Sequence, residues 1–227
     1  ALTYSSALYV ESKISPITID DVYALDRADI NSFDRKASFF LSKKAGRASD
    51  YFRTSSYLVP LLLFIDKKPR KDFTKIMLLY GETYLLRLGV THLTKRSTKR
   101  LRPYVYNELA DLSEKQKVGA HLSFFSGHVS TTSANYFFTA KVFSDYFPDS
   151  KLKPWVWTSA AIIPAVTGYL RVRAGEHFYT DVIAGYFIGA GIGVLVPHWH
   201  RNKKLDRKGV TFHVGMNSVY FSWNFNQ

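Results

Sequence analysis

Residues 170–182 read LRVRAGEHFYTDV, and this stretch carries the most specific pattern in the chain. His177 and Asp181 are four residues apart, so in a helix they share a face and the carboxylate can accept a hydrogen bond from the imidazole. Such a bond fixes the tautomer and stabilises an imidazolium. Arg171 lies off that face, and Gly175 offers a break that brings it back. For the pair alone, a surface ion pair worth roughly 0.2–0.5 kcal/mol is the simpler interpretation.

A second segment, residues 125–128, reads Phe-Ser-Gly-His and opens a helical stretch. Ser126 is a predicted N-cap, and Gly127 permits a close approach of the backbone. Free amides at a helix start form an anion site, which would place His128 beside a bound anion. By itself the segment is weak evidence for such a site and favours a capping serine followed by an exposed histidine.

A third segment, residues 94–103, concentrates positive charge. The cations are Lys95, Arg96, Lys99, Arg100 and Arg102. A mixture of mobile lysine charges and planar arginine forks suits the oxygens of a phosphate ester. A charge run standing alone more often forms a solvated loop.

Helical periodicity sets in at Ala37 and predicts an all-α helical bundle. The predicted helices cover residues 37–44, 50–65, 72–93, 130–146, 154–171 and 177–196. If consecutive helices run antiparallel, Lys95, Ser126, Arg171 and His177 fall at one end of the bundle. The opposite end then receives the connections at residues 67–71, 150–153 and 201–208.

The chain is expected to hold one domain with two appendages. We expect an irregular or short-helical arm without catalytic groups in residues 1–35. The helical domain should cover residues 36–200, and a basic linker and tail should cover residues 201–227. Apolar and polar residues alternate on both sides of residues 215–218, which predicts a β-hairpin. Packing of a sheet edge onto the bundle is the favoured role of this hairpin, and contact with a membrane or a partner is the alternative.

Composition narrows the possible functions. The 227 residues carry a formal net charge of +13, so the surface attracts nucleic acid, an acidic membrane or a phosphorylated substrate. The chain has no cysteine, which excludes disulfides and thiolate metal sites. Only residues 182–200 approach the roughly 20 apolar residues of a membrane span. The overall pattern indicates a buried helical core more than a set of independent spans.

Together the three segments resemble the signature of the type 2 phosphatidic acid phosphatase and vanadium haloperoxidase superfamily, over roughly residues 50–200. Its first part is Lys, six residues, Arg-Pro; its second is Pro-Ser-Gly-His; its third is Ser-Arg, five residues, His, three residues, Asp. The matching positions are Lys95, Arg102, Pro103, Ser126, Gly127, His128, Arg171, His177 and Asp181. Two framing positions depart from it, with Phe125 in place of proline and Leu170 in place of serine.

The resemblance implies a phosphomonoesterase that works without a metal or cofactor. In that mechanism His177 attacks phosphorus, Asp181 orients it, and His128 protonates the leaving oxygen and then activates water. The phosphoryl oxygens would be held by Lys95, Arg102, Arg171, Ser126 and the amide of Gly127. No carboxylate cluster suited to magnesium accompanies the motifs.

Several functions remain open at the level of sequence. We expect a phosphatase that acts on a lipid phosphate or isoprenyl diphosphate at a membrane surface. A soluble acid phosphatase of broad specificity fits the mean hydropathy of −0.12, and a vanadate-dependent haloperoxidase would use the same cradle. A nucleic-acid-binding module is less favoured, because it does not explain the motif spacings.

The expected location is outside the cytoplasm. The chain begins at Ala1 rather than methionine, which favours the mature end left by a signal peptide and hence export, in a bacterium to the periplasm. Both a membrane-associated and a soluble form fit this expectation, and polytopic insertion is less favoured.

Overall fold

The computed structural model describes residues 16–201, 210–215 and 218–223. Its long helices are α4 (Lys43–Ser56), α6 (Phe73–Thr98), α8 (Gly127–Tyr146), α9 (Lys153–Arg173) and α10 (Tyr179–Arg201). The shorter helical elements are α2 (Ile19–Ala24), η1 (Arg27–Asp29), α3 (Ser32–Arg35), η2 (Lys36–Phe39), η3 (Val59–Ile65), α5 (Lys67–Lys71), η4 (Pro103–Tyr106), α7 (Leu112–Lys115) and η5 (Val118–His121). The predicted all-α bundle is confirmed.

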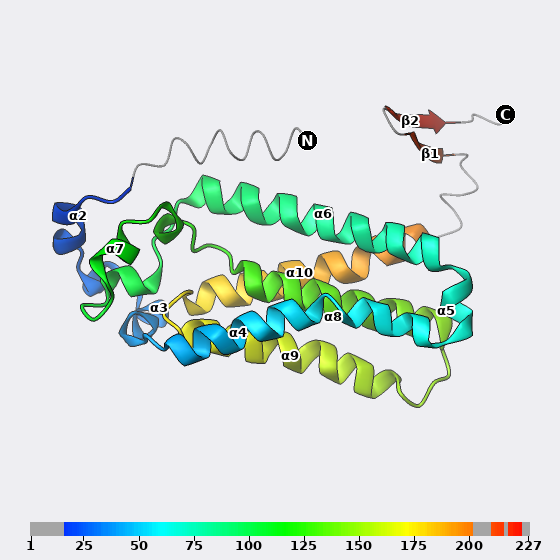
Figure 1. Ribbon diagram of the computed structural model, residues 1–227, viewed down its shortest axis with the longest axis horizontal. Helices are drawn as coiled ribbons and strands as arrows, with labels where there is room; N and C mark the ends of the chain where they lie inside the picture. Colours follow the sequence, from blue (N-terminus) through cyan, green and yellow to red (C-terminus); the bar gives the residue numbers. More distant parts are fainter. Residues whose placement is uncertain (1–15, 202–209, 216–217, 224–227) are drawn as a thin grey trace.

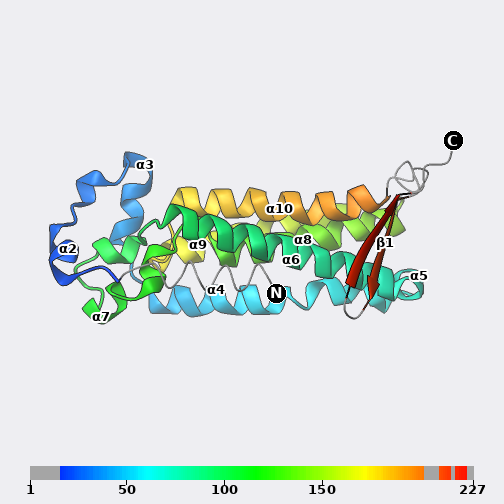
Figure 2. The same cartoon turned by 90° about the horizontal axis from the view of Figure 1, so that it is seen from above.

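Helix α8 is the centre of the bundle. It packs against α4, α6, α9 and α10, which surround it along its length (Figures 1 and 2). Many of its buried residues are small or hydroxyl-bearing, and these let the neighbouring helices come close. The basic helix α5 lies at one end of the bundle, and α2, α3 and α7 lie at the other (Figure 1).

Three glycines fix the contact between α8 and α10. A Cβ on Gly185, Gly189 or Gly193 would lie 2.7, 2.4 or 2.6 Å from a backbone oxygen of α8. The four-residue spacing puts all three glycines on one face of α10, so the two helix backbones run in direct contact. Because α10 starts at Tyr179, within the motif of residues 170–182, this contact sets that motif beside the start of α8.

The described part of the N-terminal arm folds onto the end of the bundle where the three sequence segments lie. Ile17 and Val22 pack with Val105 and Ala120 of the connection between α6 and α8. Ile30 packs in a second cluster with Phe178. The arm was predicted to be irregular or short-helical, and it forms α2, η1 and α3, each capped by an upstream Thr, Asp or Asn side chain.

Several predicted helix boundaries are wrong. Residues 37–44 do not form one helix, because Ser42 caps a new helix with its Oγ 3.2 Å from the amide of Ala45. Residues 50–65 do not form one either, since the chain tightens to a 3₁₀-helix with Pro60 in its first turn. Helix α6 continues to Thr98, so Lys95 lies in its last turn instead of following it. His177 precedes α10 and is not part of it.

The tail forms the predicted hairpin. Strand β1 (Val210–Gly215) pairs antiparallel with β2 (Ser218–Trp223), and Gly215 lies opposite Ser218. The residues between them lie outside the described residues. Whether this hairpin packs on the bundle therefore stays a prediction.

Candidate active site

The site is built around the loop that joins α9 to α10. Gly175 has a φ of +74°, and a Cβ there would lie 2.3 Å from the carbonyl oxygen of Phe40, so only glycine fits. Its own carbonyl accepts a hydrogen bond of 2.9 Å from the amide of Tyr104. The predicted break is thus real, and it brings Arg171, at the end of α9, close to the residues that precede α10.

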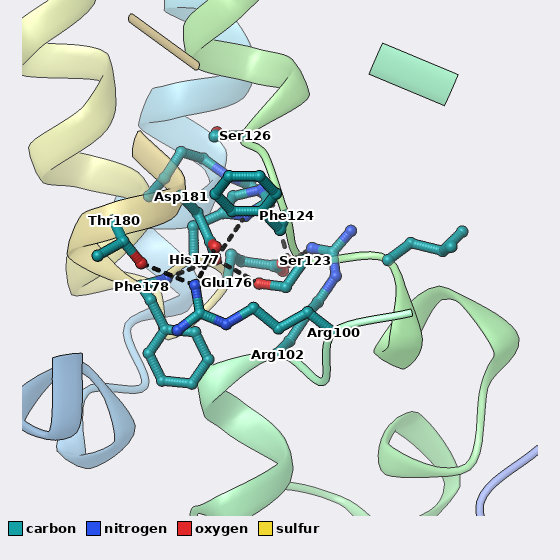
Figure 3. A network of polar contacts seen from close by, with 12 residues as sticks. Arg100, Arg102, Ser123, Phe124, Ser126, Glu176, His177, Phe178, Thr180 and Asp181 are labelled. Atoms are coloured by element: carbon teal, nitrogen blue, oxygen red, sulfur yellow. Dashed lines mark hydrogen bonds and ion pairs between the residues drawn. The ribbon is translucent and has the colours of Figure 1, made fainter. Parts of the chain in front are cut away.

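His177 and Asp181 are both buried, with exposed fractions of 1% and 0%. Nδ1 of His177 lies 3.6 Å from Oδ2 of Asp181, which is too long for the predicted hydrogen bond. Oδ2 instead accepts bonds from Oγ of Ser123 at 2.5 Å and from the amide of Phe178 at 2.9 Å (Figure 3). These bonds hold the carboxylate beside the imidazole, on its Nδ1 side.

Arg100 holds the other oxygen of Asp181. Its NH1 donates to Oδ1 at 2.7 Å, and its NH2 donates to Oδ2 of Asp34 at 2.7 Å. Asp34 also accepts from the amide and hydroxyl of Thr180, at 3.0 and 2.6 Å. The guanidinium of Arg100 stacks on the ring of Phe178, 4.2 Å from its centroid. Arg100 therefore fixes the position of Asp181 in the site. The charge run alone had instead favoured a solvated side chain at this position.

Arg102 and Arg171 share one carboxylate, that of Glu176. Oε2 of Glu176 accepts a bond from NH1 of Arg102 and lies 3.0 Å from NH2 of Arg171. Both arginines had been predicted to hold a phosphoryl group. An anion bound by both arginines would have to replace this carboxylate.

Lys95, Ser126 and Gly127 meet at the start of α8. Nζ of Lys95 donates to the carbonyls of Leu122 and of Ser123, the latter at 3.2 Å. Ser126 caps α8, as predicted, with its Oγ 3.5 Å from the amide of Val129. A Cβ on Gly127 would lie 3.7 Å from Cε of Lys95. The structure therefore brings the residues of all three sequence segments to one end of the bundle.

His128 has a partner that the sequence did not reveal. Its Nε2 lies 2.6 Å from Oδ1 of Asp50, on α4. The same oxygen lies 3.8 Å from NH1 of Arg171, whose NH1 also donates to Oγ of Ser49 at 3.3 Å. The motif pattern gave no signal for Asp50, because it lies 78 residues before His128 and only the packing of α4 on α8 joins them.

Burial and positive charge set the protonation of the site. Burial, and then the charges of Lys95 and Arg102, hold the pKa of His177 well below its usual value. Burial and the cations Arg171 and Arg53 likewise lower the pKa of His128. Both imidazoles are therefore neutral at neutral pH, which leaves a ring nitrogen of His177 able to act as a nucleophile.

Two further groups respond to the same field. Burial, and then the charge of Arg102, lower the pKa of Lys95 to about 7. Arg102 and Arg171 more than offset the effect of burial on Glu176, and they lower the pKa of its carboxyl. The carboxylate of Glu176 thus stays ionised, and it neutralises part of a cluster that would otherwise be strongly cationic.

The model of the PAP2 superfamily matches residues 76–205, which hold most of the site. The chain belongs to this superfamily. Among its relatives is the phosphatidylglycerophosphatase B of Bacillus subtilis, which is 30% identical over 160 residues, 68% of this chain and 73% of the relative. This PAP2 protein is accordingly a phosphatase.

A second relative of the PAP2 phosphatase is the lipid A 4'-phosphatase of Porphyromonas gingivalis. It is 31% identical over 78 residues, 34% of this chain and 30% of the relative, so the match spans less than a third of that enzyme. A crystal structure of a transmembrane PAP2 type phosphatidylglycerolphosphate phosphatase from Bacillus subtilis has the same fold. Its TM-score is 0.53 at 22% identity, with 87% of this chain and 94% of that chain covered.

Proposed function

We propose that the protein is a membrane-associated phosphatase that removes the terminal phosphate of a lipid through a phosphohistidine. The observation that carries the proposal is the convergence of His177, His128 and the cations Lys95, Arg102 and Arg171 at one end of the bundle. Phosphoryl transfer depends chiefly on placing positive charge and donors around the phosphoryl oxygens.

In the first step, Nε2 of His177 attacks phosphorus, because Asp181 lies on the Nδ1 side of the ring. The bond between phosphorus and the leaving oxygen breaks, and that oxygen takes a proton from His128. Burial and then nearby cations depress the pKa of His128, and two negative charges on the arriving phosphate counter those cations and favour uptake of this proton on binding. Asp50 stabilises the resulting imidazolium.

In the second step, His128 removes a proton from a water molecule, whose oxygen attacks phosphorus. The bond between phosphorus and His177 breaks, and inorganic phosphate leaves. Throughout, Arg102, Arg171, Lys95, the side chain of Ser126 and the amide of Gly127 hold the equatorial oxygens, after the carboxylate of Glu176 has given up its place to the substrate. These groups meet the charge of the substrate without a metal ion.

Lipid substrates are supported by the surface as well as by the relatives. Large apolar side chains are exposed along the outer faces of the bundle, among them Leu62, Leu78, Ile162 and Phe187. One helix among the described residues, Tyr179–His200, is long and apolar enough to cross a membrane by length and composition. An apolar surface of this kind favours burial in or against lipid over contact with water.

The catalytic end is proposed to face away from the cytoplasm, in a bacterium toward the periplasm. Lys68, Arg70 and Lys71 gather in α5 at the opposite end (Figure 1). Basic segments next to a membrane favour its cytoplasmic side.

The test is phosphate release with EDTA present, from phosphatidate, phosphatidylglycerophosphate, a lipid A phosphate, an isoprenyl diphosphate and p-nitrophenyl phosphate. We expect release from a lipid by the wild type, loss of all release in His177→Ala, and acid-labile ³²P on the wild type after brief exposure to labelled substrate. A preference for p-nitrophenyl phosphate would instead indicate a soluble acid phosphatase of broad specificity. Absence of release from every compound, with vanadate-dependent oxidation of bromide, would replace the hydrolase with a haloperoxidase.

A further inference from the structure

A polar stripe runs down α6 from the active site toward the middle of the bundle. Its members are Tyr80, Tyr84, Arg87, Thr91 and Lys95, whose spacings of three and four residues put them on one helix face. This face of α6 packs against α8. Oγ1 of Thr91 lies 3.5 Å from Oγ of Ser130, and the hydroxyl of Tyr80 donates to Oδ1 of Asn135 at 3.1 Å. The stripe is polar inside a bundle whose outer faces are apolar.

A matching stripe runs down α4. Its members are Ser49, Asp50, Arg53, Ser56 and Tyr57. Asp50 contacts His128, Oγ of Ser56 accepts a bond of 2.9 Å from Nδ2 of Asn135, and the ring of Tyr57 lies 6.2 Å from that of Tyr84 on α6. The two stripes therefore lie on the same side of α8, and they meet at the two tyrosines.

Each stripe carries an arginine, and neither arginine pairs with an acid among the residues whose side chains are described. Arg87 is 5% exposed, and its guanidinium lies over the ring of Tyr84, 5.1 Å from the centroid. Nε of Arg53 is buried without a hydrogen-bond partner. Within residues 16–200, where the structure describes side chains, no carboxylate lies within 4.0 Å of either guanidinium. Arg53 lies one helical turn from Asp50, which contacts His128, so this arginine is on the face of α4 that is turned toward the site.

Two cations of this kind are costly in an empty protein. The charge of the buried Arg87 is unfavourable without a charged partner, and the half-buried Arg53 adds the repulsion of a second positive charge. A glutamine in place of either arginine would remove the charge. An acid beside the two arginines would balance it, as Glu176 does between Arg102 and Arg171. An anionic group of a ligand, bound between Arg53 and Arg87, would supply the missing negative charge.

We propose that Arg53 and Arg87 form a second anion subsite, which binds the phosphodiester of a lipid whose terminal phosphate lies in the catalytic cradle. The inference rests on the proposed function and specifies its substrate class. Arg53 is three residues from Asp50, a rise of about 4.5 Å, and Arg87 is eight residues from Lys95, a rise of about 12 Å. The two anion sites are therefore separated by more than the single shared oxygen of a diphosphate can span. A glycerol bridge between two phosphates fits this separation better.

The experiment compares substrates that have one or two phosphoryl groups. Arg53→Gln, Arg87→Gln and the control Arg47→Gln, an exposed arginine on α4, are assayed with phosphatidylglycerophosphate and p-nitrophenyl phosphate in the same detergent. We expect the ratio of the two kcat/KM values to fall about 10- to 100-fold in each subsite variant, as for a lost charged hydrogen bond. Arg53→Lys and Arg87→Lys, which keep the charge and pack similarly, should restore most of the ratio.

A second measurement uses a molecule that fills only the proposed subsite. Phosphatidylglycerol has the phosphodiester but no terminal phosphate, so it should inhibit p-nitrophenyl phosphate hydrolysis competitively, with an inhibition constant at least tenfold higher in Arg53→Gln. Equal losses on both substrates, or a ratio no lower than that of Arg47→Gln, would overturn the subsite while leaving the phosphatase intact. A larger effect on an isoprenyl diphosphate than on phosphatidylglycerophosphate would overturn the phosphodiester assignment. A wild type that releases phosphate from no substrate would overturn the proposed function and the inference together.

Discussion

The arginines on the two sides of His128 differ in how their charge is balanced. Toward the end of the bundle, Arg102 and Arg171 share Glu176, and Arg100 bridges Asp34 and Asp181. Toward the middle, Arg87 lies over the ring of Tyr84, and Nε of Arg53 is buried without a hydrogen-bond partner. The first group is fixed in place before substrate arrives, which favours catalysis because the donors need no reorganisation. The second group gains its counter-charge only from a ligand, which favours selection among substrates.

The largest effect is expected from breaking the paired side at Arg171. Arg171→Gln removes a donor from the phosphoryl cradle, and kcat/KM for p-nitrophenyl phosphate should fall about 10²–10³-fold, as for an oxyanion-hole donor. Arg173→Gln is the matched control, because Arg173 is exposed two residues away and stacks on Phe40. Similar losses in both variants, measured at equal thermal stability, would contradict a direct role for Arg171.

A smaller loss is expected from Arg100, which acts through Asp181. Arg100→Gln should lower kcat about 10- to 100-fold, the usual range for a group that orients a catalytic residue. KM should change little, since Arg100 does not contact Glu176 or the two arginines that share it. Single-turnover formation of the phosphoenzyme should slow by the same factor. Asp34→Asn combined with Arg100→Gln should cost less than the sum of the single changes, and a rise in KM alone would contradict this role.

Replacement of Glu176 is expected to strengthen the binding of phosphate, whereas the two preceding changes weaken activity. If its carboxylate holds the place of the phosphoryl group, Glu176→Gln should lower the inhibition constant of inorganic phosphate about tenfold, which corresponds to about 1.4 kcal/mol. Glu82→Gln, an exposed acid on α6, serves as the control. A higher inhibition constant in Glu176→Gln would mean that the carboxylate aligns the arginines and does not compete with phosphate.

The smallest effect is a shift in pH dependence. Lys95 has a pKa lowered to about 7, so in the free enzyme it loses its proton and its attraction for phosphate as pH rises above 7. A plot of kcat/KM, which reports the free enzyme, should therefore fall on the alkaline side from about pH 7. Lys95→Arg stays charged, so its alkaline limb should move to higher pH. An unchanged limb would assign it to another group.

The sequence predicted those parts of the site that depend on local spacing. Ser126 caps a helix because of its position before Gly127, and Gly175 breaks the chain because its backbone needs a positive φ. The helix order also placed the three motifs at one end. In contrast, Asp50 and Asp34 come from segments without motifs, and only packing brings them to His128 and Arg100.

Charge balance could not be predicted either. Arg96, Lys99, Arg100 and Arg102 look alike in the sequence, yet Arg100 binds two buried carboxylates while Lys99 is exposed. Whether a cation is solvated, paired or waiting for a ligand depends on groups that are far away in the chain. The predicted His177–Asp181 hydrogen bond failed for the same reason, since Ser123 and Phe178 compete for the same carboxylate oxygen.

The bond between Asp34 and Thr180 also has a consequence for the order of biosynthesis. The two residues are 146 positions apart, and Arg100, which joins them, is made between them. Asp34 therefore leaves the ribosome long before either of its partners exists. A nascent chain that ends before Thr180 cannot complete the site. The enzyme should therefore become active only when α10 has been made and has docked against α8.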